Sequence, residues 1–451
     1  MTIARAPSRP GRRILFIKPS AYDQRGRLIR GPRAFFPSRT LPYLAALTPP
    51  GFDLRIIDDA VQDWPIDHEA DLVVLTGMLP NMPRAIDIAR GFHQRGIPTV
   101  IGGIGVFSVR KLLADSGVFT SIVDGEAEPV WPTILADHQR GQLQAGYCGG
   151  HDAQLAGLPT ARYDLVDMRR YWRMPGHSRP LLAVETARGC PFDCSFCAVT
   201  LYFGRRMRFR PVGDVIDEIR RLGATYVIFS DDDLMADADR AAELFAALKP
   251  LGIRWGGQFG IAAARHPEVM RLAAQSGCRN AMVGIESLTP QNLRDVNKGR
   301  AAQIPVEHVA EVFRAAGVAM TASMIFGLEH DTVQSLGQTT DRLIHSGADF
   351  LLPWILCPGP GCEVHAQFQR EGRLLHQNYS LYNGIDVVFR PRHMTPAQLA
   401  RASQDALKRF YSLARIAGRS WRAADKLDVL GLSLYFWNAA RLGRHPFYGV
   451  T

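Results

Sequence analysis

The stretch that decides the fold is Ala187-Arg-Gly-Cys190-Pro-Phe-Asp-Cys194-Ser-Phe-Cys197, which follows a short apolar run at 181–184. Its cysteines are spaced C-x3-C-x2-C, and three thiolates can hold three irons of a cubane cluster while the fourth iron stays open. A structural zinc site would need a fourth ligand nearby, and a disulfide framework would leave one cysteine unpaired. The spacing therefore predicts a [4Fe–4S] cluster on Cys190, Cys194 and Cys197; zinc, buried free thiols and a chance arrangement are the alternatives.

This stretch, with the aromatic Phe196 before its last cysteine, resembles the signature of radical S-adenosylmethionine (SAM) enzymes. The resemblance implies that the amino and carboxylate groups of SAM chelate the open iron. One electron from the cluster then breaks the sulfonium bond, and the resulting 5′-deoxyadenosyl radical takes a hydrogen atom from the substrate. The protein positions and tunes these groups. The resemblance also implies an electron donor such as a flavodoxin or a ferredoxin.

The composition limits the broad class of the protein. A chain of 451 residues suggests two or three domains, and 47% apolar with 21% charged residues is typical of a soluble globular protein. Seven cysteines, three of them clustered, fit a reducing cytoplasm, and the basic start at 1–13 lacks the apolar core of a signal peptide. The net charge of +10 indicates a solvated basic surface, with an acidic substrate or anionic lipid as alternatives. No nucleic-acid motif is present, so we expect no nucleic-acid partner.

Short apolar runs alternate with helical stretches over residues 1–145. The predicted strands are 14–17, 55–57, 72–75, 99–101 and 119–123, and the predicted helices are 41–47, 82–94, 109–114 and 129–138. This alternation predicts a Rossmann-like open parallel sheet covered on both faces, with a ligand at the carboxyl ends of its strands. The candidate cofactor-binding residues at those ends are Thr76, Gly77, Gly102, Gly103, Gly125 and Glu126.

This layout resembles the cobalamin-binding domain that precedes many radical SAM enzymes. The similar segments are Pro42–Pro49, Ile56–Asp59, the glycine pair at 102–103 and Gly125-Glu126. The family's cobalt-ligating D-x-H-x-x-G motif is missing, since 58–63 contains no histidine. The resemblance then implies cobalamin held without a protein ligand. An empty or repurposed domain, with its glycines serving as turn residues, is the alternative.

An irregular linker is expected over 146–180, followed by a partial (βα)6 TIM-type barrel over 181–360. Its six strands are predicted at 181–184, 226–229, 255–261, 280–287, 324–328 and 350–356. The site should lie at the carboxyl ends of these strands.

Three positions in the barrel are further candidates for cofactor binding. The resemblance implies that Asp231 and Asp232 receive the amino group of SAM and that Glu286, in Gly-Ile-Glu-Ser, meets its ribose. Gln258 lies in a Gly-rich strand, where glycine marks close approach of a ligand or of backbone.

The region 361–451 is predicted to be mostly helical, and the resemblance implies that it shapes the substrate pocket. Residues 395–415 predict one long amphipathic helix. Residues 429–440 are expected to pack on the barrel, with a peripheral contact to a membrane surface as the alternative beside the basic segment 415–422. Cys357 and Cys362 are expected to be buried thiols, with hydrogen-atom donation as the alternative.

The resemblance favours cobalamin-dependent methylation of an unactivated carbon in a small molecule or a lipid. One alternative is radical chemistry without methyl transfer, such as cyclisation, dehydration, oxygenation or rearrangement in natural-product, porphyrin or lipid biosynthesis. An alternative of another class is a non-enzymatic iron–sulfur or corrinoid carrier or sensor.

Overall fold

The computed structural model describes residues 12–65, 68–174, 180–299, 303–423 and 425–442; the basic start expected at 1–13 lies almost wholly outside them. The chain divides into two compact units, of which the first holds most residues up to 170 and the second most residues from 171 onward. Each unit is a parallel α/β structure, as the alternation of strands and helices predicted.

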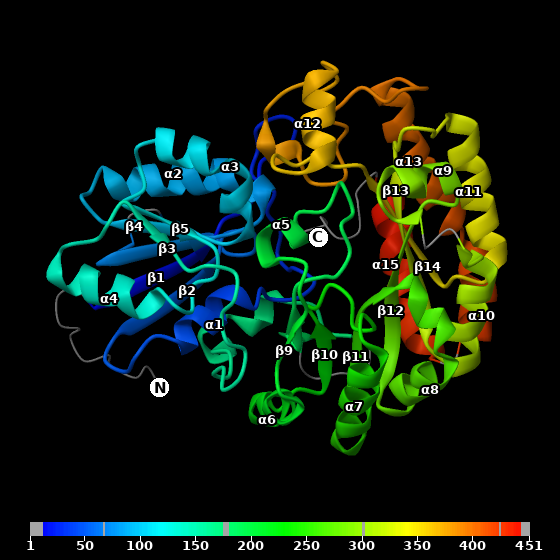
Figure 1. Ribbon diagram of the computed structural model, residues 1–451, viewed down its shortest axis with the longest axis horizontal. Helices are drawn as coiled ribbons and strands as arrows, with labels where there is room; N and C mark the ends of the chain where they lie inside the picture. Colours follow the sequence, from blue (N-terminus) through cyan, green and yellow to red (C-terminus); the bar gives the residue numbers. More distant parts are fainter. Residues whose placement is uncertain (1–11, 66–67, 175–179, 300–302, 424, 443–451) are drawn as a thin grey trace. The chain divides into compact units, whose positions relative to one another are not determined.

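The first unit is a sheet of six parallel strands in the order β2-β1-β3-β4-β5-β6. Its strands are β1 (Arg13–Lys18), β2 (Asp53–Asp58), β3 (Leu72–Thr76), β4 (Thr99–Gly102), β5 (Ser121–Asp124) and β6 (Gly146–Cys148). Its helices are α1 (Thr40–Ala46), α2 (Met82–His93), α3 (Ile104–Asp115) and α4 (Trp131–Arg140). In Figure 1, α2 and α3 lie on one face of the sheet and α1 and α4 on the other.

Alternation along each strand supplies both faces with apolar side chains. Ile14 and Phe16 of β1 pack with α1 and α4 residues such as Trp131 in one cluster. Leu15 and Ile17 point to the other face, since successive strand residues alternate, and both are buried. A sheet buried on both faces explains why its strands read as continuous apolar runs.

The five strands expected in this unit are present, and a sixth, β6, was not predicted. Residues from 147 onward were expected to be irregular, but Gly146–Cys148 pairs in parallel with β5. The strand has only three residues and one buried side chain, Tyr147, so it carries no apolar run. Helix α3 also begins five residues earlier than expected and is kinked at Val109.

The second unit is a sheet in the order β14-β13-β12-β11-β10-β7, all parallel, with a small antiparallel pair β8-β9. Its strands are β7 (Leu182–Val184), β8 (Ala187–Arg188), β9 (Arg208–Phe209), β10 (Tyr226–Phe229), β11 (Arg254–Gly260), β12 (Cys278–Glu286), β13 (Ala319–Phe326) and β14 (Phe350–Ile355). Its helices are α5 (Val199–Phe203), α6 (Val212–Leu222), α7 (Ala238–Leu248), α8 (Pro267–Gln275), α9 (Pro290–Asp295), α10 (Val306–Ala316), α11 (Val333–Ser346) and α12 (Glu363–Arg370). Six strands that neighbour one another in chain order, with helices between them, confirm the predicted partial barrel (Figure 1).

The C-terminal region is helical, but the single long helix expected over 395–415 is wrong. Helix α13 (Pro396–Phe410) ends before Tyr411, and α14 (Leu413–Arg422) and α15 (Lys426–Arg441) follow. The fully buried Tyr411 hydroxyl bonds to both the N–H (2.9 Å) and the C=O (3.0 Å) of Leu351. This attachment to β14 holds Tyr411 outside regular helical geometry. Within the described residues, none of the helices combines the length and the apolar character that crossing a bilayer requires.

Two glycines with similar backbone angles provide a stability test of the first unit. Gly125 (φ +76°) follows β5, and a Cβ there would lie 2.1 Å from the Gly150 oxygen, whereas Gly141 (φ +67°) ends α4 in open space. Gly141→Ala should lower the free energy of unfolding by about 1 kcal/mol, the cost of a left-handed alanine. Gly125→Ala should lower it by roughly 3 kcal/mol because the overlap with backbone adds to that cost. Chemical denaturation followed by circular dichroism measures both, and equal losses would contradict the clash.

Candidate functional site

The cysteine loop follows β7 and the short strand β8, at the carboxyl end of the second sheet. Gly189 (φ +90°) opens the loop, and a Cβ there would lie 2.3 Å from the Arg206 oxygen. The loop is fixed from two sides: the Ser195 N–H donates to Val296 (3.3 Å), and the Val364 N–H donates to the Ser195 oxygen (3.2 Å). Inside the loop, the Cys197 N–H donates a hydrogen bond to the Cys194 oxygen (3.0 Å), and this tight turn keeps the two cysteines close together.

The three thiols are half-buried, and those of Cys190 and Cys194 each interact electrostatically with that of Cys197. Burial raises the pKa of Cys190 and of Cys194 to about 11, and it raises the pKa of Cys197, so iron binding must displace the thiol protons. Over the described ranges, no three His, Cys, Asp or Glu side chains are grouped to hold a single metal ion. A cubane needs no such convergence because each cysteine binds a different iron, so this donor set fits a cluster with one open corner.

The acidic run after β10 is the second predicted feature at this end of the barrel. Asp231 is buried and accepts hydrogen bonds from the Thr186 hydroxyl (2.7 Å) and the Thr186 N–H (3.1 Å). Asp233 accepts from the N–H groups of Gly260 (2.8 Å) and Met235 (2.9 Å). These two carboxylates therefore hold backbone in place.

Asp232 differs from its neighbours because it is half-buried. Burial, followed by the charges of Asp231, Glu185 and Asp233, raises its pKa to about 7. Its charge also acts on Cys190 and Cys197, so it lies near the cysteine loop. Of the two acidic residues predicted to meet SAM, Asp231 is thus engaged with Thr186, whereas Asp232 is partly exposed beside the thiols.

The glycines around Gln258 are explained by packing within the protein. A Cβ at Gly257 would lie 2.5 Å from the Leu234 side chain, and one at Gly260 would lie 2.4 Å from the Asp233 carboxylate. The Gln258 oxygen accepts the Leu234 N–H (2.9 Å), and its side chain is half-buried on β11. The glycines thus mark close approach of neighbouring segments, the second of the two meanings expected for them.

Glu286 ends β12 with a left-handed backbone (φ +64°) and pairs with Lys298, a residue that the sequence analysis missed. Lys298 Nζ lies 2.6 Å from Glu286 Oε1 and donates to the Gly284 oxygen at 3.0 Å. Burial opposes the charge of Lys298, but the Glu286 carboxylate raises its pKa above the ordinary value. The Lys298 charge also acts on Cys194 and Cys197, so the pair belongs to the same site.

A buried network connects the ends of β12 and β13. The Asn292 side chain, fully buried on α9, donates to Asp331 (2.8 Å) and to the Ser287 hydroxyl (3.3 Å). Asp331 in turn accepts the N–H groups of Gly327 (2.9 Å) and Leu328 (3.0 Å). Since every member of this network bonds to another element, the strand ends are fixed before any ligand binds.

The described part of the C-terminal region, 361–423 and 425–442, contacts both ends of the barrel strands. Cys362 is buried and lies near Cys197, and burial raises the pKa of the thiols of Cys357 and Cys362 to about 12. By contrast, α15 reaches the amino ends of the strands, where Asp428 pairs with Arg254 (3.1 Å) and Phe436 packs on Phe350 (5.8 Å). The part that lies beside the cysteine loop is therefore the stretch around α12.

In the first unit, the predicted residues gather at the carboxyl ends of the strands, but most are used in internal packing. A Cβ at Gly103 would lie 2.5 Å from the Thr76 hydroxyl, and one at Gly77 would lie 2.8 Å from Asn81. The buried Glu126 accepts the Ala153 N–H at 2.8 Å. A Cβ at Gly102 would lie 3.3 Å from the Val123 side chain, a less severe contact.

Two apolar side chains at this edge were missed by the sequence analysis. Met78 follows β3 and is 65% exposed, and Phe107, near the start of α3, is 37% exposed. A Cβ at the intervening Gly105 would lie 2.6 Å from the Gly77 oxygen, so the two loops touch without side chains between them. Exposed apolar side chains thus flank closely packed backbone at the carboxyl ends of the strands.

Residues 58–63 stand where the family has its cobalt-ligating motif, and Asp59 of this segment is held in ion pairs. Asp59, after β2, accepts the Ser20 hydroxyl (2.8 Å) and the Arg84 guanidinium (2.8 Å), and it also pairs with Arg30. Although burial opposes its ionisation, Arg84 and Ser20 hold the pKa of Asp59 below its usual range. The Asp59 carboxylate therefore contributes structure at the end of β2.

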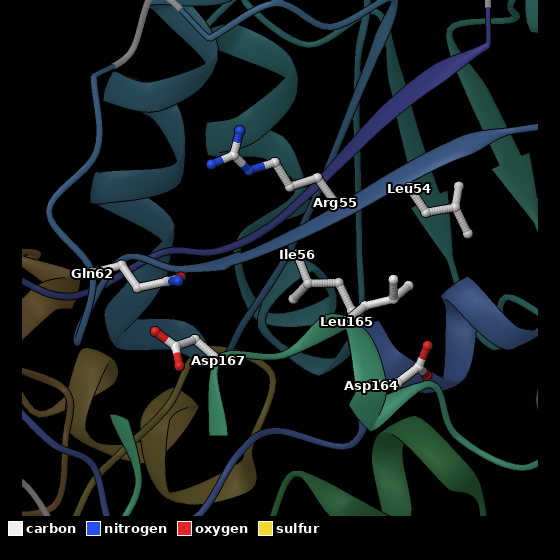
Figure 2. A pocket seen from close by; sticks show the side chains of 7 residues that line it. All are labelled: Leu54, Arg55, Ile56, Gln62, Asp164, Leu165 and Asp167. Atoms are coloured by element: carbon white, nitrogen blue, oxygen red, sulfur yellow. The ribbon is translucent and has the colours of Figure 1, made fainter. Parts of the chain in front are cut away.

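A hollow of about 430 Å3 lies in the first unit, and Figure 2 shows the side chains that line it. It is lined by Leu54, Arg55, Ile56, Gln62, Asp164, Leu165 and Asp167. Its two carboxylates are paired with neighbouring arginines, Asp164 with Arg162 (2.7 Å) and Asp167 with Arg169 (2.8 Å). None of the predicted cofactor residues lines it, so it is separate from the candidate site.

Residues 184–343 match the family model of the radical SAM superfamily. The chain carries a radical SAM domain and is a radical SAM enzyme, and this domain implies a [4Fe–4S] cluster and SAM.

Two curated relatives align with most of the chain. Bacteriochlorophyllide d C-12(1)-methyltransferase of Chlorobaculum tepidum is 27% identical, in an alignment that covers 78% of this chain and 77% of that protein. Anaerobic magnesium-protoporphyrin IX monomethyl ester cyclase of Cereibacter sphaeroides is 25% identical, in an alignment that covers 91% of this chain and 72% of that one.

A solved structure shares the fold across both units. The radical SAM methyltransferase TsrM from Kitasatospora setae, solved with cobalamin and a [4Fe–4S] cluster bound, aligns with a TM-score of 0.62 at 18% identity. The alignment covers 87% of this chain and 85% of that one.

Lys298→Met should destabilise the second unit because Glu286 would keep its charge in a largely buried position without its cation. We expect a loss of roughly 3 kcal/mol in the free energy of unfolding, the size typical of breaking a buried pair. Adding Glu286→Gln to this variant should restore much of that loss, because it removes the uncompensated carboxylate. Urea denaturation of Lys298→Met, Glu286→Gln and the double variant measures the coupling, and a double-variant loss equal to the sum of the two single losses would contradict it.

Proposed function

We propose that this enzyme methylates an unactivated carbon of a small molecule or lipid with the help of cobalamin. The observation that carries the proposal is the combination, in one chain, of the cysteine loop with a separate parallel-sheet unit that has an open apolar edge. The methyltransferase relative and the cobalamin-containing TsrM, whose fold spans both units, support it.

In this proposal Cys190, Cys194 and Cys197 hold the cluster. When bound, the cluster supplies the electron that cleaves SAM, and cobalamin carries the methyl group. Gly189 and the Ser195 backbone fix the thiols in the loop.

The neighbouring polar residues then orient SAM. Asp231 holds Thr186 and so keeps the ends of β7 and β10 together. The neighbouring Asp232 carboxylate would then accept a hydrogen bond from the amino group of SAM. Glu286, held by Lys298, would accept hydrogen bonds from the ribose hydroxyls. A flavodoxin or ferredoxin would supply the electron.

The edge of the first sheet would hold the corrin. Met78 and Phe107 offer apolar contact, and the touching backbones at Gly77 and Gly105 leave a surface free of side chains. Asp59 stays in its ion pairs with Arg84 and Arg30, so no ligand reaches cobalt from this segment.

The first test is made on protein reconstituted without oxygen with iron, sulfide and hydroxocobalamin. We expect the visible spectrum after gel filtration to contain corrinoid bands, and we expect 5′-deoxyadenosine after addition of SAM and a reductant. Cells that make the protein and are grown on methionine labelled in its methyl group should accumulate a labelled product that is missing from cells making a cysteine-to-alanine triple variant. A product without label would exclude methylation, and release of no 5′-deoxyadenosine would leave a carrier or sensor.

The second candidate is radical chemistry without methyl transfer, and the alignment of the cyclase relative with 91% of the chain favours it. The same labelling experiment separates the two candidates, because a cyclisation, dehydration, oxygenation or rearrangement consumes SAM without transferring its methyl group.

Replacing Cys190, Cys194 and Cys197 together by alanine should reduce bound iron from about four atoms per chain to nearly none. Cys148→Ala is the matched control, because this thiol is exposed and lies in the first unit. Iron and sulfide analysis of both reconstituted proteins measures the effect. Unchanged iron in the triple variant would contradict the cluster assignment.

Met78→Glu should weaken cobalamin retention, because a charged carboxylate would face an apolar ring at an edge that now exposes a thioether. Leu112→Glu is the matched control: Leu112 is also exposed on the first unit but lies toward the far end of α3. We expect at least a tenfold lower affinity for hydroxocobalamin in the first variant only, measured by equilibrium dialysis, with about 1.4 kcal/mol corresponding to each tenfold change. Equal affinities would rule out this edge.

A further inference from the structure

The hairpin formed by α14 and α15 exposes a concentration of large apolar side chains. Trp421 is 78% exposed, Leu427 72% and Leu413 56%. Leu430, Leu434 and Leu442 are also exposed, so this short segment holds six of the fourteen exposed large apolar residues in the described chain. Single exposed leucines need no explanation, but a group of this kind marks an interaction surface.

The exposed apolar side chains of α15 are not needed for its packing on the barrel. Leu427, Leu430 and Leu434 recur at helical spacing on one face, and Trp437 continues it half-buried. The opposite face carries Val429, Ser433, Phe436 and Ala440, all buried. One side of the helix thus serves the core, and the other side is an apolar stripe in water.

The charged side chains that this hairpin exposes to solvent are positive. Arg415, Arg422, Lys426 and Arg441 are exposed. The two carboxylates, Asp425 and Asp428, are turned inward to Arg254 at 3.1 Å each. Two of the cations lie over indole rings: Lys426 is 4.8 Å from the Trp421 ring centre, and Arg441 is 5.2 Å from that of Trp437.

We propose that the α14–α15 hairpin docks on an anionic lipid surface. Leucine and tryptophan side chains enter the boundary between head groups and acyl chains, while arginine and lysine beside them meet the lipid phosphates. A second copy of this chain fits the surface less well, because a two-fold contact would bring the same four cations together. The proposal does not depend on the reaction, since the hairpin lies at the amino ends of the barrel strands and the cysteine loop at their carboxyl ends.

The test is sedimentation of the full-length protein with vesicles of phosphatidylcholine alone or of phosphatidylcholine mixed with an equal amount of phosphatidylglycerol. We expect binding to the mixed vesicles that weakens as salt is added, and little binding to the neutral ones. Trp421→Ser combined with Leu427→Ser, and separately Arg415→Glu combined with Arg422→Glu, should each lower the partition coefficient roughly tenfold or more.

Matched controls use exposed residues elsewhere in the protein. Leu112→Ser with Val333→Ser, and Arg221→Glu with Arg271→Glu, should leave vesicle binding unchanged. Thermal unfolding of every variant shows whether the fold is kept. Equal binding of hairpin and control variants would overturn the proposal. The proposal would also be overturned if the protein formed a dimer that the hairpin substitutions dissociate. Binding of the protein to an acidic flavodoxin, with no binding to vesicles, would overturn it as well.

Discussion

The hydrogen bonds between Thr186 and the Asp231 carboxylate hold the end of β7 against the end of β10, and the cysteine loop starts from that junction. Burying a carboxylate is costly, and here burial raises the pKa of Asp231 to about 7. Hydrogen bonds to the carboxylate offset this cost. Their donors belong to Thr186, the residue that leads into the loop. The left-handed Gly189 and the contacts of Ser195 can set the loop's path only because its origin is fixed.

The alternating strands and helices were predicted well from the sequence, because the same pattern recurs several times along the chain. Apolar runs that alternate with amphipathic helices reproduce both parallel sheets, and the cysteine spacing marks the radical SAM domain. Features that depend on one contact were missed: β6 has three residues and a single buried side chain, and the break after Phe410 depends on the Tyr411 hydroxyl reaching Leu351. Lys298 was missed because its partner, Glu286, is twelve residues away and comes near it only through the turn of α9.

In the structure, the glycine and acidic residues that were expected near a ligand serve different roles. Gly125, Gly257 and Gly260 leave room for neighbouring protein atoms, although the same residues at strand ends also suggested a ligand. Asp231 and Asp233 bind backbone, and Asp232 remains beside the thiols. Residue type alone does not separate these roles, because the hydrogen-bond donors that decide them come from other strands.

The separation of the α14–α15 hairpin from the cysteine loop, at opposite ends of the barrel strands, also has a practical consequence. A thiol introduced as Trp421→Cys would sit on the exposed surface, far along the fold from the three native loop cysteines. In a chain that also carries Cys148→Ala, which removes the exposed native thiol, this introduced thiol would let the enzyme be tethered to an electrode with the cysteine-loop end of its barrel directed away from the electrode.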